Sequence, residues 1–232
     1  MTEMTEMGQF ENLGINEGVE TSTELFDKIA VKAEKLVKES YKVVGRTAMF
    51  PIDIVLIAGN LGIEIQRENL NPVGTANFSK KLAVTTSNSD GVKIIVDTSV
   101  SYMTRRYAIA NGVGRYLLNE SQSMLKNTYA IPLVPQSLEE IAADSIAIFL
   151  LLPVTLFKDE FLRYLNACEE HPLNVDEWLT HLSNVSQVTP FNLAIGYQQM
   201  KQVLCYQRQM EFAKYNYDIT QMPEDPYEKI FS

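Results

Sequence analysis

The residue types that perform most enzyme chemistry are few and unfavourably spaced in this chain. Its two histidines, His171 and His181, lie ten residues apart, whereas two zinc ligands on one helix need a spacing of four. The two cysteines, Cys168 and Cys205, match neither a zinc motif nor a redox motif, and we expect both as reduced thiols. We expect each histidine to face solvent or to cap a helix, so these residues alone predict no catalytic centre.

Two glycines interrupt a helical pattern in the middle of the chain. Gly112 and Gly114 lack the preceding strand and turn that a phosphate-binding loop requires. Each glycine costs about 1 kcal/mol relative to alanine inside a helix. We therefore expect either close packing at these positions or a helix that has no need of rigidity.

The elements that must position these residues follow from the spacing of apolar side chains. Helical spacing predicts one amphipathic helix over residues 22–44 and a second, which is led by Pro51 and closed by Gly62. Short β-branched runs then predict a sheet of three or four strands, with strands at 63–65, 82–85 and 92–96. The helical period returns after Asp97 and predicts a helix capped by Ser99 or Ser101, followed by helices at 137–152, 156–168, 176–182 and 191–212. The expected fold class is α+β, a small sheet packed on helices and followed by a helical C-terminal segment.

Length and charge restrict the class of protein and of partner. The 232 residues allow one ordinary domain with an appendage or two small ones, and 46% hydrophobic with 21% charged residues excludes collagen-like and wholly disordered chains. The 20 Lys and Arg against 29 Asp and Glu give a net charge of −9, which argues against nucleic acid as the main partner. The longest apolar stretch, 145–157, contains Pro153 and is too short for a bilayer, and no signal pattern begins the chain. We expect a cytoplasmic protein with no membrane partner.

Five local strings follow one another in a characteristic order. They occupy residues 51–65, 91–97, 105–119, 139–153 and 182–186. In that order they resemble the helix-to-strand entry, central strand, active-site helix, third-ligand helix and C-terminal helical segment of the ImmA/IrrE family of zinc metallo-endopeptidases. The resemblance covers about residues 25–205.

The resemblance implies a division of the chain into four parts. A zincin-like domain of the IrrE N-terminal type is expected over residues 22–157, and a helical segment with a helix-turn-helix-like pattern over 158–217. An acidic tail, 1–21, precedes them, and a second tail, 218–232, follows.

The resemblance also implies that the family's chemistry is missing from this chain. Family members carry His-Glu-x-x-His where this chain reads NGVGR, so that Asn111, Gly112 and Arg115 replace both imidazole ligands and the general base. The third-ligand position aligns with Ala142, which has no donor atom, and a shifted register would restore at most Glu139 or Glu140. Because a zincin needs all of these groups, we expect no metal, no other cofactor and no peptidase activity.

Arg115 carries the most specific expectation. In the family a divalent cation would lie between this helix and the acidic helix, and a guanidinium could replace it by pairing with a carboxylate. The carboxylates within reach in sequence are Asp144, Glu140 and Glu139. The alternative is that Arg115 simply points to solvent.

The expected function is that of a pseudo-peptidase that acts by binding. Relatives in the family act on helix-turn-helix repressors of mobile elements or stress regulons, so the resemblance implies a bacterial or phage transcription regulator, an antirepressor that sequesters such a repressor or another protein of the same element. One alternative is a DNA-binding regulator that uses the helix-turn-helix-like stretch 175–194, although residues 170–200 contain no Lys or Arg. Another alternative is a residual metallopeptidase with non-standard ligands.

Overall fold

A computed structural model describes residues 22–70, 82–88, 91–119, 138–167 and 174–214. The expected tails, 1–21 and 218–232, lie outside these residues, and so do Cys168 and His171.

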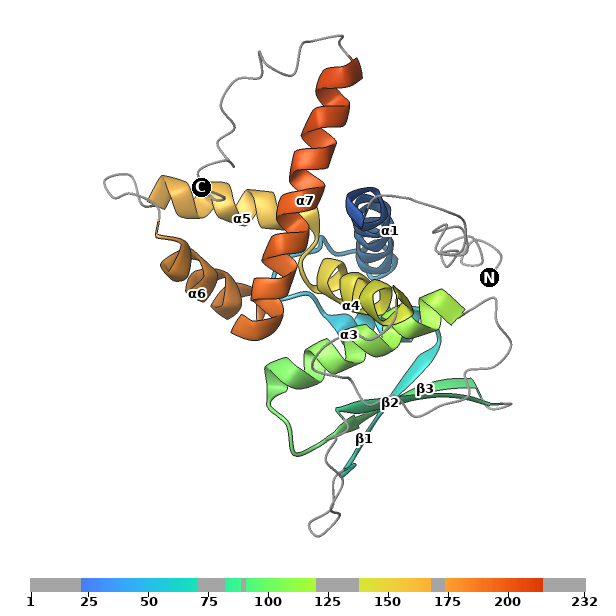
Figure 1. Ribbon diagram of the computed structural model, residues 1–232. Helices are drawn as coiled ribbons and strands as arrows, with labels where there is room; N and C mark the ends of the chain where they lie inside the picture. The colour runs from blue at the N-terminus through green and yellow to red at the C-terminus, as the bar shows by residue number, and fades with distance from the viewer. Residues whose placement is uncertain (1–21, 71–81, 89–90, 120–137, 168–173, 215–232) are drawn as a thin grey trace.

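The described chain alternates from helices to a small sheet and back to helices (Figure 1). This order confirms the predicted α+β class, a small sheet packed on helices. In chain order the elements are α1 (Ser22–Val43), α2 (Ile54–Asn60), β1 (Ile63–Glu68), β2 (Ala83–Asn88), β3 (Gly91–Asp97), α3 (Tyr102–Asn119), α4 (Leu138–Leu151), α5 (Val154–Ala167), α6 (Val175–Ser186) and α7 (Pro190–Lys214).

The sheet has three strands in the described residues, in the order β1-β3-β2. The central strand β3 pairs in parallel with β1 and antiparallel with β2. Ile94 of β3 stands opposite Ile65 of β1 and Thr85 of β2, and its side chain is fully buried. The prediction of three or four strands is therefore confirmed at three for this part of the chain.

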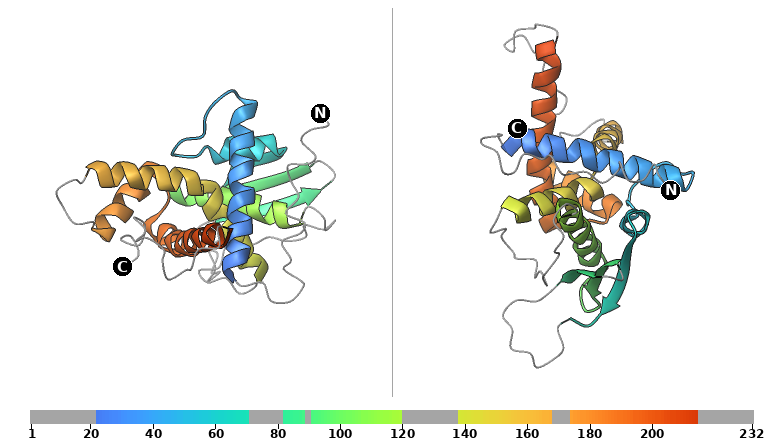
Figure 2. Two further views of the ribbon diagram at one scale, coloured as in Figure 1. Left: turned by 90° about the horizontal axis from the view of Figure 1, so that it is seen from above. Right: turned by 90° about the vertical axis from the view of Figure 1, so that its right-hand side faces the viewer.

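The helices form layers on one side of the sheet. Helix α3 lies across the sheet, and α4 packs on α3 (Figures 1 and 2). Helix α1 crosses α4 and α7, and the C-terminal half of α7 extends beyond the rest of the molecule (Figure 2). A single hydrophobic cluster runs from Phe26 on α1 to Leu204 on α7, across the expected boundary at residue 157.

Polar caps explain where two helices begin. Asp53 Oδ1 accepts the backbone N–H groups of Val55 and Leu56, so α2 begins at Ile54. The prediction of a helix led by Pro51 is wrong by three residues because the Asp53 side chain satisfies the first free N–H groups. Ser101, one of the two predicted caps, accepts the N–H of Thr104 through its hydroxyl and begins α3.

No single helix among the described residues is long and apolar enough to cross a membrane. The consecutive stretches 140–151 and 154–167 reach such a length and composition only as a pair, which is bent by 52° at its break.

Candidate functional site

A hydrogen-bonded chain of side chains joins α3 to α4. Tyr107, Asn111 and Arg115 are spaced by four residues on α3 and therefore share one face of that helix. Tyr107 Oη and Asn111 Nδ2 donate to the same oxygen, Asp144 Oδ1 of α4, at 3.0 and 2.5 Å. Arg115 Nε donates to Asn111 Oδ1 at 2.9 Å, so Asn111 links the guanidinium to the carboxylate.

Burial determines the electrostatics of this network. Arg115, Asn111 and Tyr107 are each at most 5% exposed. Burial raises the pKa of Asp144, while the hydrogen bond from Tyr107, the charge of Arg115 and the hydrogen bond from Asn111 oppose that rise. Burial and the Asp144 carboxylate together raise the pKa of Tyr107, so its phenol stays a neutral donor. The network therefore links a buried guanidinium to a partly buried carboxylate through Asn111.

The two glycines of α3 lie at close contacts with neighbouring elements. A Cβ at Gly112 would stand 2.8 Å from Cδ1 of Ile94 in the sheet. A Cβ at Gly114 would stand 2.6 Å from the backbone oxygen of Ala143 on α4, a distance that no side chain tolerates. Of the two reasons expected for these glycines, close packing applies.

The structure places the residues expected at the former metal site as follows. Asn111 and Arg115 both join the network, and Arg115 is buried, so it does not point to solvent. Ala142 is fully buried in the hydrophobic cluster. Glu140 is partly exposed and raises the pKa of Asp144 through its charge. The Glu139 side chain lies outside the described residues.

These side chains do not suit a zinc ion. Asp144 Oδ1 already accepts two hydrogen bonds, Asn111 Oδ1 accepts a third, and Arg115 brings a permanent positive charge. Within the described ranges, no three His, Cys, Asp or Glu side chains are grouped so that they could hold a metal ion.

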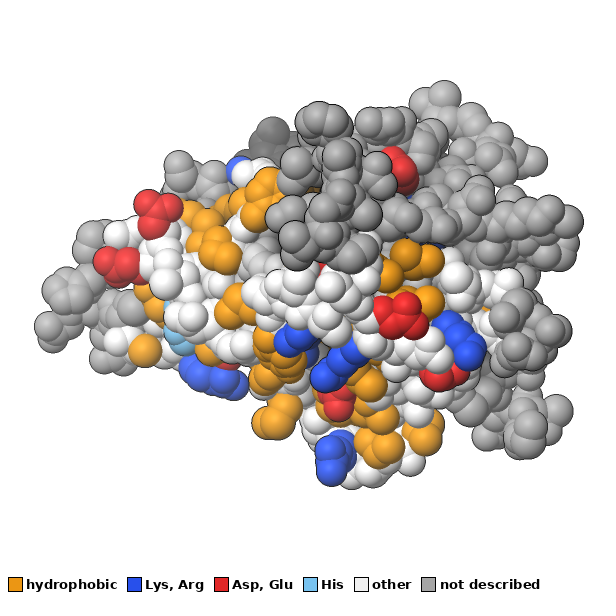
Figure 3. All heavy atoms as spheres, turned by 90° about the horizontal axis from the view of Figure 1, so that it is seen from below, with side chains coloured by type: hydrophobic (Ala, Val, Ile, Leu, Met, Phe, Trp, Pro, Cys, Tyr) orange, Lys and Arg blue, Asp and Glu red, His pale blue; other side chains and the backbone are white. Residues whose placement is uncertain are grey.

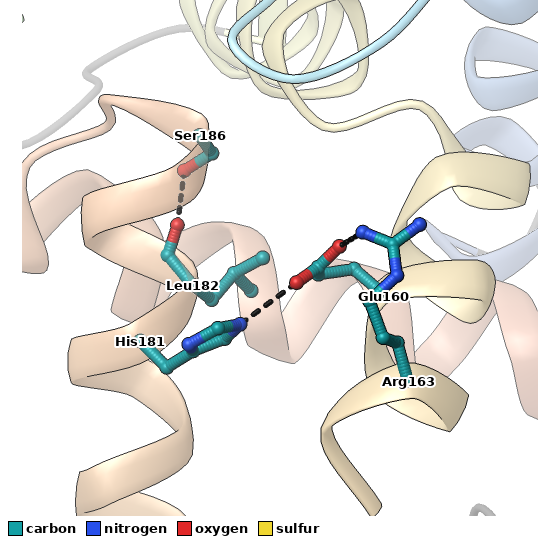
Figure 4. Close-up of polar contacts among 5 residues, drawn as sticks. All are labelled: Glu160, Arg163, His181, Leu182 and Ser186. Carbon is teal, nitrogen blue, oxygen red and sulfur yellow. Dashed lines mark hydrogen bonds and ion pairs between the residues drawn. The ribbon is translucent and has the colours of Figure 1, made fainter. Parts of the chain in front are cut away.

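A second polar cluster joins α5 to α6 (Figure 4). Glu160 of α5, with a side chain 8% exposed, meets His181 Nε2 at 2.8 Å through one oxygen and Arg163 Nη1 at 2.5 Å through the other. The His181 ring also lies against the fully buried Trp178. The His181 side chain is 36% exposed and so faces solvent in part, as expected, but its ring also joins α6 to α5 through Glu160. Nothing in the local sequence indicates this pairing.

The helix-turn-helix-like stretch forms two helices joined by a short turn. Helix α6 ends at Ser186, Gln187 takes a left-handed backbone conformation at φ 56°, and α7 begins at Pro190. The exposed side chains in the first turns of α7 include Phe191 and Ile195 and carry no charge. The turn thus has the predicted shape without the cations that contacts to DNA phosphates require.

Comparison with known proteins identifies no relative, because no family model matches this chain and no curated protein does. The resemblance to ImmA/IrrE peptidases therefore depends on the five strings alone. What the chain does must be argued from the contact between α3 and α4.

Proposed function

We propose that this chain is a catalytically inactive, ImmA/IrrE-like pseudo-peptidase of the cytoplasm that regulates transcription by binding a protein. Its partner is a helix-turn-helix repressor of a phage or mobile element, which it antagonises by sequestration. The observation that carries the proposal is the buried chain from Arg115 through Asn111 to Asp144. Two of its residues, Asn111 and Arg115, stand at positions that the resemblance assigns to the metal motif.

The network supports binding over hydrolysis because its hydrogen bonds engage polar side chains that hydrolysis would need. A peptidase requires a carboxylate placed to take a proton from water, and Tyr107 and Asn111 both donate to Oδ1 of Asp144 and so engage that oxygen in the contact between α3 and α4. The close approach of Gly114 to Ala143 further holds the two helices together, without space for substrate between them at that point. The contact between α3 and α4 is thus closely packed at the place where the family performs chemistry.

Charge supports a DNA-binding protein as the partner. A repressor binds phosphates through clustered Lys and Arg, whereas this chain has a net charge of −9. Opposite charges favour association and raise its rate at low salt. An acidic protein that covers the basic face of a repressor would compete directly with operator DNA.

A titration distinguishes sequestration from cleavage. A candidate helix-turn-helix repressor is bound to its labelled operator, and increasing amounts of the chain are added while DNA release and the intact mass of the repressor are measured. Sequestration predicts release that saturates when the chain equals the repressor in amount, with the repressor at full length. Release by a small fraction of the chain, together with shortened repressor, would contradict the proposal and support a residual peptidase.

The control titrates the chain against operator DNA alone. The proposal predicts no shift of the DNA, because residues 170–200 contain no Lys or Arg. Tight binding of the chain to bare operator would instead support the DNA-binding alternative.

A further inference from the structure

A second arginine of α3, Arg106, is buried without a carboxylate partner. It is 5% exposed, and its Nε and Nη2 donate to the backbone oxygens of Gln187 and Ser186, both at 3.3 Å. These oxygens belong to the C-terminal end of α6, whose dipole compensates part of the charge. No carboxylate of the described residues forms an ion pair with Arg106, whose two carbonyl contacts use one N–H each of Nε and Nη2 out of the five N–H donors of a guanidinium.

Arg106 lines a small cavity together with two further arginines. The cavity of about 60 Å³ is bordered by Arg67 at the end of β1 and by Arg105 of α3. Arg105 makes one long hydrogen bond, 3.4 Å to the backbone oxygen of Thr98. Arg67 is exposed and, like Arg105, forms no ion pair with any residue that the structure describes. Three cations therefore surround one opening.

The single carboxylate at this cavity does not neutralise it. Asp53 also lines the opening, but its Oδ1 is engaged in capping α2. Three arginines against one aspartate give a local charge of +2, in a chain whose net charge is −9. Figure 3 shows Lys and Arg side chains beside hydrophobic ones on the face seen from below. Because a buried charge is normally paired, the buried Arg106 with two more arginines beside it favours the binding of an anion at this opening.

We propose that this cavity binds the oxyanion of a small ligand, a phosphate or a carboxylate group. Guanidinium groups match both through paired N–H donors. The cavity holds a single such group, since whole drug-sized ligands occupy about 300–1,000 Å³. The remainder of the ligand would lie against the Tyr102 ring, which is 55% exposed and has the Arg106 guanidinium 5.8 Å from its centroid.

The features of the site disfavour a nucleic acid. A polyanion needs a track of cations along its backbone, and here the cations surround one small opening in an acidic chain. Neither the α3–α4 network nor a repressor partner enters this inference, so it stands or falls independently of the proposed function.

The test measures anion binding to the full chain by calorimetry and by its thermal midpoint. Inorganic phosphate and acetate are each titrated against sodium chloride at matched ionic strength. Binding of either anion, with a rise in the midpoint that chloride does not reproduce, is the expected result. If neither phosphate nor acetate binds more strongly than chloride, the proposal is wrong.

Two variants locate the binding. The double variant Arg67→Met with Arg105→Met leaves Arg106 in its structural contacts and should weaken binding about tenfold or more, as expected for lost charged hydrogen bonds. The matched control also removes two cations: Arg46→Met with Lys42→Met changes two exposed residues that do not line the cavity, and its affinity should equal that of the wild type. Equal weakening in both would mean that the anion responds to total charge, and would overturn the site.

Discussion

Each end of α3 carries an arginine, and the two arginines are buried to the same extent. Hydrogen bonds link one of them to a carboxylate, whereas the other has backbone oxygens as its hydrogen-bond acceptors. Arg115, near the C-terminal end, reaches Asp144 through Asn111. Arg106, near the N-terminal end, donates to backbone oxygens at the C-terminal end of α6 and lines a cavity with two other arginines. Both side chains are 5% exposed.

The difference teaches where to look for function on this helix. A charge that the protein compensates internally is part of its structure, and Arg115 is such a charge. A buried cation that forms no ion pair with the described residues can bind an anionic ligand from solution, and Arg106 is such a cation. The C-terminal part of α3, which resembles a reaction centre, therefore has a structural role. The N-terminal part of α3, which carries Arg106, lines the proposed binding site.

The largest expected effect comes from a steric clash where the C-terminal part of α3 packs on α4. Gly114→Ala would place a Cβ 2.6 Å from the backbone oxygen of Ala143, so α3 and α4 must separate. We expect the free energy of unfolding in urea to fall by about 2–3 kcal/mol. Gly59→Ala on α2 is the matched control: nothing lies within 4 Å of its Cβ, and it should gain up to about 1 kcal/mol. Equal behaviour of the two variants would show that the helices are not in close contact.

The next effect separates the two kinds of arginine. Arg115→Met leaves the Asp144 carboxylate uncompensated and should lower the free energy of unfolding by about 1–3 kcal/mol. Arg67→Met, the same change on β1 at the cavity, should alter it by no more than about 0.5 kcal/mol because Arg67 is exposed and forms no ion pair with another described residue. An unchanged thermal midpoint for Arg115→Met would mean that the network contributes nothing to stability.

The smallest expected effect is a pH dependence of stability that comes from Asp144, in the network between α3 and α4. Because burial raises the pKa of Asp144 in the folded state, the folded protein holds this proton more tightly than the unfolded chain does. The contribution of Asp144 to stability is therefore most favourable below the ordinary pKa of about 4 and declines as pH rises through the raised pKa. Asp144→Asn cannot ionise, so its stability relative to the wild type should increase over that window. A difference between the two proteins that stays constant from acid to neutral pH would contradict the raised pKa.

Much of the fold could be predicted because local spacing determines it. Apolar periodicity located α1, α3, α4 and α7 to within a few residues, and Gly62, with its φ of 73°, closes α2 as expected. The start of α2 was missed because the Asp53 cap outweighs the preference of proline for a first turn. Helix α6 continues to Ser186, four residues past its predicted end, because Ser186 is buried and its hydroxyl donates to the Leu182 oxygen inside the same helix (Figure 4).

The sites could be predicted only where residues repeat along one helix or where a resemblance named them. Asn111 and Arg115 were named, and so was Asp144, whereas Tyr107 was not, although it continues the same spacing by four. The contact between Glu160 and His181 and the contact of Arg106 with the end of α6 join segments 21 and about 80 residues apart. Such contacts depend on how the helices pack, and nothing in the local sequence reports them.

The central claim is that the α3–α4 contact replaces a metal centre with a charge network. The most direct test is elemental analysis of protein expressed in zinc-supplemented medium and purified with mild chelation. The account predicts far less than one zinc per chain, because Arg115 adds a positive charge, Oδ1 of Asn111 and Oδ1 of Asp144 already accept hydrogen bonds, and the described residues group no three His, Cys, Asp or Glu side chains for the ion. About one tightly held zinc per chain, lost only together with the fold, would contradict it.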